Sequence, residues 1–276
     1  MNPAFIHLRV HSDYSLLEGA IHLKDMVKWA KAKNMPAIGL ADHANLFGSL
    51  EFSLAAADSG IQPILGCTLM LQPAQPDTRA GVRPKPDQLL AYAQNETGWK
   101  NLLALVSKSY LAPAGGTAPL LSMDDVAAHS EGLLILTGGI YGAVGKALLA
   151  GRDAYAEEQL LTLSRLFPGR LYMELMRHGL PEEKQTEARF IKLAYAHNIP
   201  LVATNDVYFI EEDMYEAHDA FLCIADGAYV SEDKRRRLTP EHRLKPIEEM
   251  QALFADIPEA LAKSVSFAQR CAFVAE

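Results

Sequence analysis

Short apolar segments alternate with amphipathic segments along this chain, and the alternation restricts the possible folds more than any other feature. In the first segment, Ile6, Leu8 and Val10 alternate with polar or aromatic residues, the period of two that is typical of a strand. Strands separated by helices favour a parallel sheet with crossover helices, and their number here favours a barrel. The predicted strands cover residues 5–11, 37–40, 63–71, 89–93, 133–137, 171–176 and 200–204. We therefore expect an α/β fold, a distorted seven-stranded β/α barrel.

The segments between these strands carry helix signals. Apolar residues at 22–33 recur at the spacing of one helix face. Ser122 and Asp125 have the spacing of a capping box, and Pro181 suits the first turn of a helix. Two stretches rich in proline or glycine, 72–87 and 113–119, predict irregular structure. The other predicted helices are 49–58, 98–110, 142–150, 153–166, 182–197, 213–226, 246–255 and 257–270.

The length of 276 residues allows one large barrel or two small domains, and we expect a single domain over residues 1–276. A doubly wound sheet is the alternative fold, but no Gly-x-Gly-x-x-Gly or Walker signature supports it. The net charge of −8 makes a strong phosphate-binding face improbable. Three widely spaced cysteines fit a reducing cytoplasm, and no apolar run is long enough to span a membrane.

Polar residues gather where the predicted strands end or begin, which is where β/α barrels build their active sites. The first strand ends in Arg9 and His11, and Glu18 follows in the next loop. The other candidate positions are His43, Thr68, Gln88, Gly139, Asp206 and Tyr208. We expect these side chains to converge at one rim of the barrel.

The stretch from Phe5 to Gly19, with a histidine after the first strand and a carboxylate directly before a glycine, resembles the opening motif of the PHP (polymerase and histidinol phosphatase) family. The longer match is similar to the PHP domains at the N-terminus of bacterial DNA polymerase III alpha subunits. Segments that extend this similarity are 95–102, 171–181, 202–206, 216–224 and 253–261. The resemblance thus covers nearly the whole chain, and the helical segment 246–276 would lead toward a polymerase palm that lies beyond it.

The resemblance implies which residues bind metal in active members of this family. Such members hold up to three ions for phosphoester hydrolysis at nine positions. This chain keeps a ligand-type residue at His11, Glu18, His43 and Asp206. The other five positions hold Arg9, Thr68, Gln88, Gly139 and Tyr208. A catalytic zinc needs three protein ligands and an open position, so we expect no metal and no catalytic residue in this fragment.

Arg9 stands where active members of the family carry a histidine. Loss of the metal ions would leave Glu18 and Asp206 as carboxylates without a counter-charge, which is costly in a partly dry site. A guanidinium is a fork of donors suited to carboxylates. We therefore expect Arg9 to replace the lost positive charge by pairing with Asp206 or Glu18.

The resemblance implies that the parent chain is a DNA-directed DNA polymerase, a cytoplasmic nucleotidyltransferase of chromosomal replication with magnesium in its palm. Degenerate PHP domains of this kind are implied to support the polymerase and to dock the separate proofreading exonuclease (epsilon-type) subunit, while the parent enzyme contacts DNA. The basic run 234–237 is interpreted as a solvated loop rather than a DNA contact. Two alternatives stay open: an active phosphoesterase or 3′–5′ exonuclease using zinc or manganese, and a free-standing phosphatase of the histidinol phosphatase branch.

Overall fold

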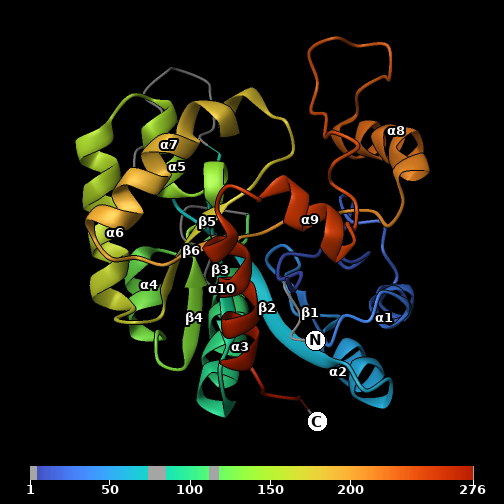
Figure 1. The fold of residues 1–276 in the computed structure, drawn as a ribbon, viewed down its shortest axis with the longest axis horizontal. Helices are drawn as coiled ribbons and strands as arrows, with labels where there is room; N and C mark the ends of the chain where they lie inside the picture. Colours follow the sequence, from blue (N-terminus) through green and yellow to red (C-terminus); the bar gives the residue numbers. More distant parts are fainter. Residues whose placement is uncertain (1–4, 74–84, 112–117, 276) are drawn as a thin grey trace.

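One mixed sheet of six strands forms the centre of the fold in the computed structural model, which describes residues 5–73, 85–111 and 118–275 (Figure 1). The strands follow one another in chain order across the sheet. They are β1 (Ala37–Leu40), β2 (Gln62–Leu71), β3 (Asp87–Ala93), β4 (Leu133–Leu136), β5 (Leu171–Leu175) and β6 (Leu201–Ala203). Nearly every residue of these strands is buried, which explains their apolar sequences.

The expectation of an all-parallel sheet is wrong at β3. This strand pairs antiparallel with β2, with Cys67 opposite Ala91, and antiparallel with β4, with Leu90 opposite Leu136. The other neighbouring pairs are parallel. A parallel return to the sheet needs a crossover connection, usually a helix, and the sequence between β2 and β3 has no helix signal. Most of that proline-rich connection, and most of the loop predicted at 113–119, lies outside the described residues.

The prediction of a first strand over residues 5–11 is also wrong, because this segment forms no strand of the sheet. The segment is buried and meets both edges of the sheet through a few hydrogen bonds. On one side Gly39 N donates to His7 O at 2.7 Å, and on the other His11 N donates to Val207 O at 2.9 Å. Val207 N donates in turn to Arg9 O at 3.1 Å. Each edge is met at too few residues for a continuous ladder, so the segment joins β1 to the end of β6 without being a regular strand.

A glycine permits this close approach. A Cβ atom at Gly39 of β1 would lie 2.3 Å from Leu8 O, inside van der Waals contact. The opening segment can therefore lie against β1 only because residue 39 lacks a side chain.

Helices surround the sheet, with α5, α6 and α7 on one side and α1 and α2 on the other (Figure 1). The predicted apolar face of α1 is confirmed, since Leu23, Met26, Val27 and Ala30 are buried. The capping box is also present, because Asp125 N donates to Ser122 Oγ at 3.2 Å. The helices of the described residues are α1 (Leu23–Ala32), α2 (Ser49–Asp58), α3 (Glu96–Leu111), α4 (Met123–Ala128), η1 (Gly139–Tyr141), α5 (Ala143–Leu149), α6 (Asp153–Leu166), α7 (Pro181–Ala196), η2 (Glu212–Met214), α8 (Tyr215–Asp226), α9 (Ile247–Leu253) and α10 (Pro258–Gln269).

The last helix, α10, packs onto the core. Its Phe267 ring meets Tyr92 of β3 edge-on at 5.1 Å, and Ser264 Oγ accepts a hydrogen bond from Ile6 N at 2.9 Å. The three cysteines, Cys67, Cys223 and Cys271, are free and buried. None of the helices in the described residues combines the length and apolar character that a membrane span requires.

Candidate functional site

Arg9 is fully buried at the centre of the predicted site and reaches three partners with its guanidinium. Its Nε donates to Asp206 Oδ1 at 2.7 Å, and its Nη1 donates to Glu174 Oε2 at 3.0 Å. Its Nη2 donates to Gln88 Oε1 at 2.5 Å. The predicted pairing of Arg9 with Asp206 is therefore confirmed, and the second carboxylate partner is Glu174 rather than Glu18.

The electrostatics of this cluster favour one cation between two anions. Burial by itself would raise the pKa of Asp206, but the Arg9 charge and the hydrogen bond from His11 hold it well below its usual range. Burial raises the pKa of Glu174, and Arg9 and Thr204 oppose this effect. Thr204 Oγ1 donates to Glu174 Oε1 at 2.6 Å. Arg9 stays charged, because these two carboxylates raise its pKa against the effect of burial.

His11 extends the cluster from the other side of Asp206. Its Nε2 donates to the same Oδ1 atom at 2.7 Å, and its ring centroid lies 4.5 Å from that of Tyr208 and 4.3 Å from that of His43. Burial lowers the pKa of His11, so the neutral ring is favoured. Tyr208 Oη donates a longer hydrogen bond to Asp206 Oδ2 at 3.4 Å. His11 thus positions the Asp206 carboxylate and packs against the rings of Tyr208 and His43.

Glu18 belongs to a second group of contacts, beside the first. Its carboxylate accepts from His43 Nδ1 and from Arg236 Nη1, the latter at 2.5 Å. Burial would raise the pKa of Glu18, but His43 and Arg236 lower it to about 2. Both retained carboxylates therefore have cationic or hydrogen-bonding partners from the protein itself.

The two remaining predicted positions present no ligand atom to this cluster. Thr68 forms a bridge with the backbone of His43, and its hydroxyl donates to Ala41 O at 2.9 Å. Gly139 has a φ of +54°, and a Cβ atom there would lie 2.3 Å from Met176 Cε and 3.8 Å from Glu174 Oε2. The space beside Gly139 is thus taken by Met176. Contacts connect the other seven predicted positions: Arg9 with Gln88 and Asp206, Asp206 with His11 and Tyr208, and His43 with His11 and Glu18.

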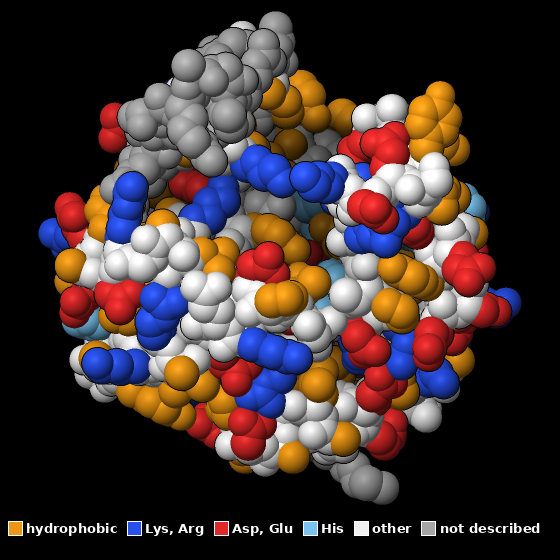
Figure 2. All heavy atoms as spheres, turned by 90° about the horizontal axis from the view of Figure 1, so that it is seen from above, with side chains coloured by type: hydrophobic (Ala, Val, Ile, Leu, Met, Phe, Trp, Pro, Cys, Tyr) orange, Lys and Arg blue, Asp and Glu red, His pale blue; other side chains and the backbone are white. Residues whose placement is uncertain are grey.

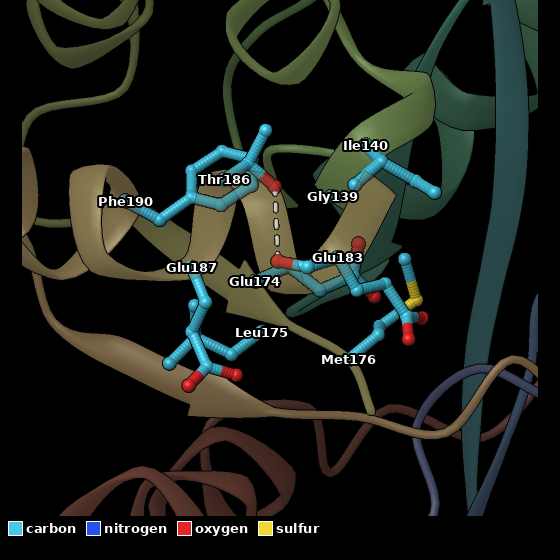
Figure 3. Close-up of a pocket in the computed structure, with 9 residues that line it drawn as sticks. All are labelled: Gly139, Ile140, Glu174, Leu175, Met176, Glu183, Thr186, Glu187 and Phe190. Carbon is cyan, nitrogen blue, oxygen red and sulfur yellow. Dashed lines mark hydrogen bonds between the residues drawn. The ribbon is translucent and has the colours of Figure 1, made fainter. Parts of the chain in front are cut away.

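One face of the molecule is hollowed near its centre, and histidine side chains are visible in the hollow (Figure 2). A narrow pocket lies beside the cluster, between η1 and α7 (Figure 3). Its carboxylates are all partnered: Glu174 by Arg9, Glu183 by His178, and Glu187 by Arg177. The pocket therefore offers no free anionic group to a ligand.

The cluster does not fit a bound metal. Across residues 5–73, 85–111 and 118–275, no three His, Cys, Asp or Glu side chains are grouped so that they could hold an ion. The guanidinium of Arg9 also lies between Glu174 and Asp206, where a divalent cation would meet its positive charge. We therefore derive no chemical step through a metal here.

Sequence reasoning missed two members of the site, Glu174 and His178. Glu174 is fully buried in β5, and His178 Nε2 accepts a hydrogen bond from Asp206 N at 3.0 Å. One signal was available, since Glu174 is the only charged residue in the apolar segment 171–176. A charge inside a buried strand needs a partner of opposite charge, so Glu174 could have been predicted as a second carboxylate partner of Arg9.

Comparisons with known proteins agree on one family. A DNA polymerase III subunit alpha from Caulobacter vibrioides (strain NA1000 / CB15N) is 50% identical over 275 residues, which are 98% of this chain and 24% of that protein. The same subunit from Escherichia coli (strain K12) is 39% identical over 270 residues, which are 98% of this chain and 23% of that protein. This chain thus spans about a quarter of the length of these relatives.

A solved structure of an amidohydrolase from Chromobacterium violaceum, with bound sulfate and no metal, aligns with a TM-score of 0.49 and 14% identity. The alignment covers 78% of this chain and 96% of the amidohydrolase. The sequence model of the PHP domain family matches residues 7–178, which make up more than half of the chain. The chain belongs to the PHP domain family.

Proposed function

We propose that this chain is the N-terminal PHP domain of a cytoplasmic, template-directed replicative DNA polymerase alpha subunit, and that the domain itself performs no phosphoester chemistry. The identity of 50% to a DNA polymerase III subunit alpha over 98% of the chain supports the first part. The parent chain would carry its magnesium-dependent palm after residue 276. Residues 1–276 would form one domain, in which the opening segment takes the place of the seventh strand of a distorted β/α barrel.

The Arg9 cluster supports the proposal that the domain performs no phosphoester chemistry. A buried carboxylate pair needs a cation, and Arg9 meets Asp206 and Glu174 at 2.7 and 3.0 Å. A guanidinium supplies charge and directional hydrogen bonds, but it cannot activate a water molecule as a bound zinc does. The positive charge at the site would therefore have a structural role, and the nine positions would be a vestigial metal site.

The role that remains for such a domain is support. We assign it the stabilisation of the polymerase chain and the docking of the separate proofreading exonuclease (epsilon-type) subunit, while DNA is held by the parent enzyme. Co-purification of the epsilon-type subunit with the tagged chain tests the docking role. Retention of the exonuclease at equimolar amounts is expected, and complete failure to retain it at micromolar concentrations would contradict that role.

Elemental analysis tests the loss of activity. The chain purified without chelator should contain far less than one equivalent of zinc or manganese and should not hydrolyse a phosphodiester. One or more equivalents of metal, together with hydrolysis that is lost in a His11→Ala variant, would overturn the proposal. In that case His11, Glu18, His43 and Asp206 would be the ligands of an active phosphoesterase or exonuclease.

Genomic sequence downstream of codon 276 tests the identity of the parent chain. We expect an open reading frame that continues into a polymerase palm. A stop codon directly after Glu276 would instead favour a free-standing phosphatase of the histidinol phosphatase branch.

A further inference from the structure

Helix α8 and the segment that follows it, residues 215–238, stand apart from the sheet (Figure 1). We call this region the arm. Only three of the twelve residues of α8 are buried, and Ile224 and Tyr229 are each 75% exposed. The main contact of α8 with another helix or strand is with η2, the short turn directly before it. Regions with so few buried apolar contacts open at lower free energy than a packed core.

The arm is held together by its own ion pairs. Arg235 donates to both carboxylate oxygens of Asp219, at 2.6 and 2.5 Å, and Arg236 Nε donates to Asp226 Oδ2 at 3.2 Å. Tyr215 Oη donates to Leu238 O at 3.1 Å, which joins the beginning of the arm to its end. These contacts join α8 to the segment that follows it, so the arm has few bonds to the core beyond its base.

Two neighbouring segments attach the arm to the core. Phe209 and Arg243 form a β-bridge, and Leu244 N donates to Phe209 O at 3.1 Å. The chain therefore leaves the core and returns to it at the same place. Such a paired base can act as a hinge while the region beyond it moves.

Beyond this base, the side-chain hydrogen bonds from the arm to the rest of the described chain converge on Glu18. His218 Nε2 donates to Glu18 O at 2.6 Å, and Arg236 Nη1 donates to Glu18 Oε1 at 2.5 Å. The second carboxylate oxygen of Glu18 accepts from His43 Nδ1. One residue thus connects the arm to the histidines at the strand ends.

We propose that the arm is a hinged latch, that Arg236 and His218 close it onto Glu18, and that opening it exposes His43 to solvent. In the closed state the Nε2 atom of His43 is buried and has no hydrogen-bond partner within the described residues. When Arg236 leaves, Glu18 loses the contact that fixes its carboxylate against His43. The arm and the imidazole of His43 therefore change together.

Hydrogen exchange of the full chain, followed by mass spectrometry, tests the latch. Arg236→Ala should speed exchange of peptides from 215–238 by about fivefold, the factor for an ion pair of this exposure, and leave β4 and β5 unchanged. Arg236→Lys should restore most of the protection. Arg237→Ala is the matched control, because the hydrogen bonds that Arg237 makes among the described residues stay within the arm, to the carbonyl oxygens of Val230 and Glu232.

Modification of histidines by diethyl pyrocarbonate tests the coupling to His43. The rate at His43 should rise about fivefold in both Arg236→Ala and Glu18→Gln, with the exposed His22 as internal reference. Exchange and modification rates equal to those of Arg237→Ala would overturn the latch. Faster exchange in β4 and β5 to the same degree as in the arm would overturn it too, since Arg236 would then stabilise the whole fold.

Discussion

Two groups of ion pairs lie near each other in the fold. Arg9 pairs with Asp206 and Glu174 in one, Arg236 pairs with Glu18 in the other, and the two groups differ in how exposed they are to water. The side chains of Arg9 and Glu174 are fully buried and that of Asp206 is nearly so, whereas Arg236 is 36% and Glu18 25% exposed. A buried charge depends on every partner, because the loss of one leaves the others desolvated and unpaired. An exposed pair loses little, because water replaces the partner. The first group is therefore a fixed part of the core, and the second is adjustable.

The largest expected effect comes from removing the central cation. Arg9→Ala leaves Asp206 and Glu174 buried without a counter-charge and should lower the free energy of unfolding by about 3 to 5 kcal/mol. Denaturation in urea measures the change. Arg9→Lys is the control and should recover part of the loss, since it restores charge but not the three-way fork. A change below about 1 kcal/mol in Arg9→Ala would mean that the cluster is not what holds the strand ends together.

The next largest effect should be the loss of stability in acid as the Glu18 carboxylate becomes protonated. The pKa of Glu18 is lowered in the fold to about 2 from an ordinary 4.5, so its stabilising contribution is complete above pH 4.5 and disappears as the pH falls through 2. This shift corresponds to a loss of about 3 kcal/mol at most between these pH values. Thermal unfolding measured from pH 6 to pH 2 should show a shallower acid slope in Glu18→Gln than in the parent chain. Parallel slopes in the two proteins would contradict the lowered pKa.

The close contact between Gly39 and Leu8, which positions the opening segment, should not tolerate a larger side chain at residue 39. Gly39→Ala places a methyl group 2.3 Å from Leu8 O, one residue before Arg9, and should cost about 1 to 3 kcal/mol of stability. Calorimetry can measure this, with Ala57→Ser on the exposed side of α2 as a neutral control. Wild-type stability in Gly39→Ala would show that the opening segment moves freely against β1, and the fixed character of the Arg9 cluster would need another cause.

The smallest expected effect separates the two groups most clearly. Arg236→Ala should lower the global free energy of unfolding by less than about 1 kcal/mol, because its ion pair with Glu18 is partly exposed. Urea denaturation beside Arg9→Ala gives the comparison directly. A loss as large as that of Arg9→Ala would show that both groups belong to one cooperative core.

Much of this could be predicted from the sequence, for reasons that are local. The apolar run of β5 and the helical spacing in α1 are properties of consecutive residues, and Ser122 reaches Asp125 within one turn. An arginine at position 9, where the resemblance to the PHP family implies a histidine, could also be read from the opening motif. Its pairing with Asp206 followed from charge, since a buried carboxylate at a strand end needs a cation.

The errors came from non-local pairing. The direction of β3 depends on how the chain returns to the sheet, and the opening segment divides its hydrogen bonds between β1 and Val207. Apolar pattern alone predicts an extended buried segment in both cases, and it does not say which neighbours that segment will have.

By itself, the sequence determined most of the strands and helices, and the spacing of Arg9, His11 and Glu18 along the opening segment. Only the tertiary structure decided that Glu174 is the second anion of Arg9, 165 residues away, and that Arg236 closes on Glu18 across 218 residues. The physical reason is distance along the chain. Propensity and charge act within a few turns of a residue, whereas these partners meet only after the sheet has curled and brought the ends of its strands to one face.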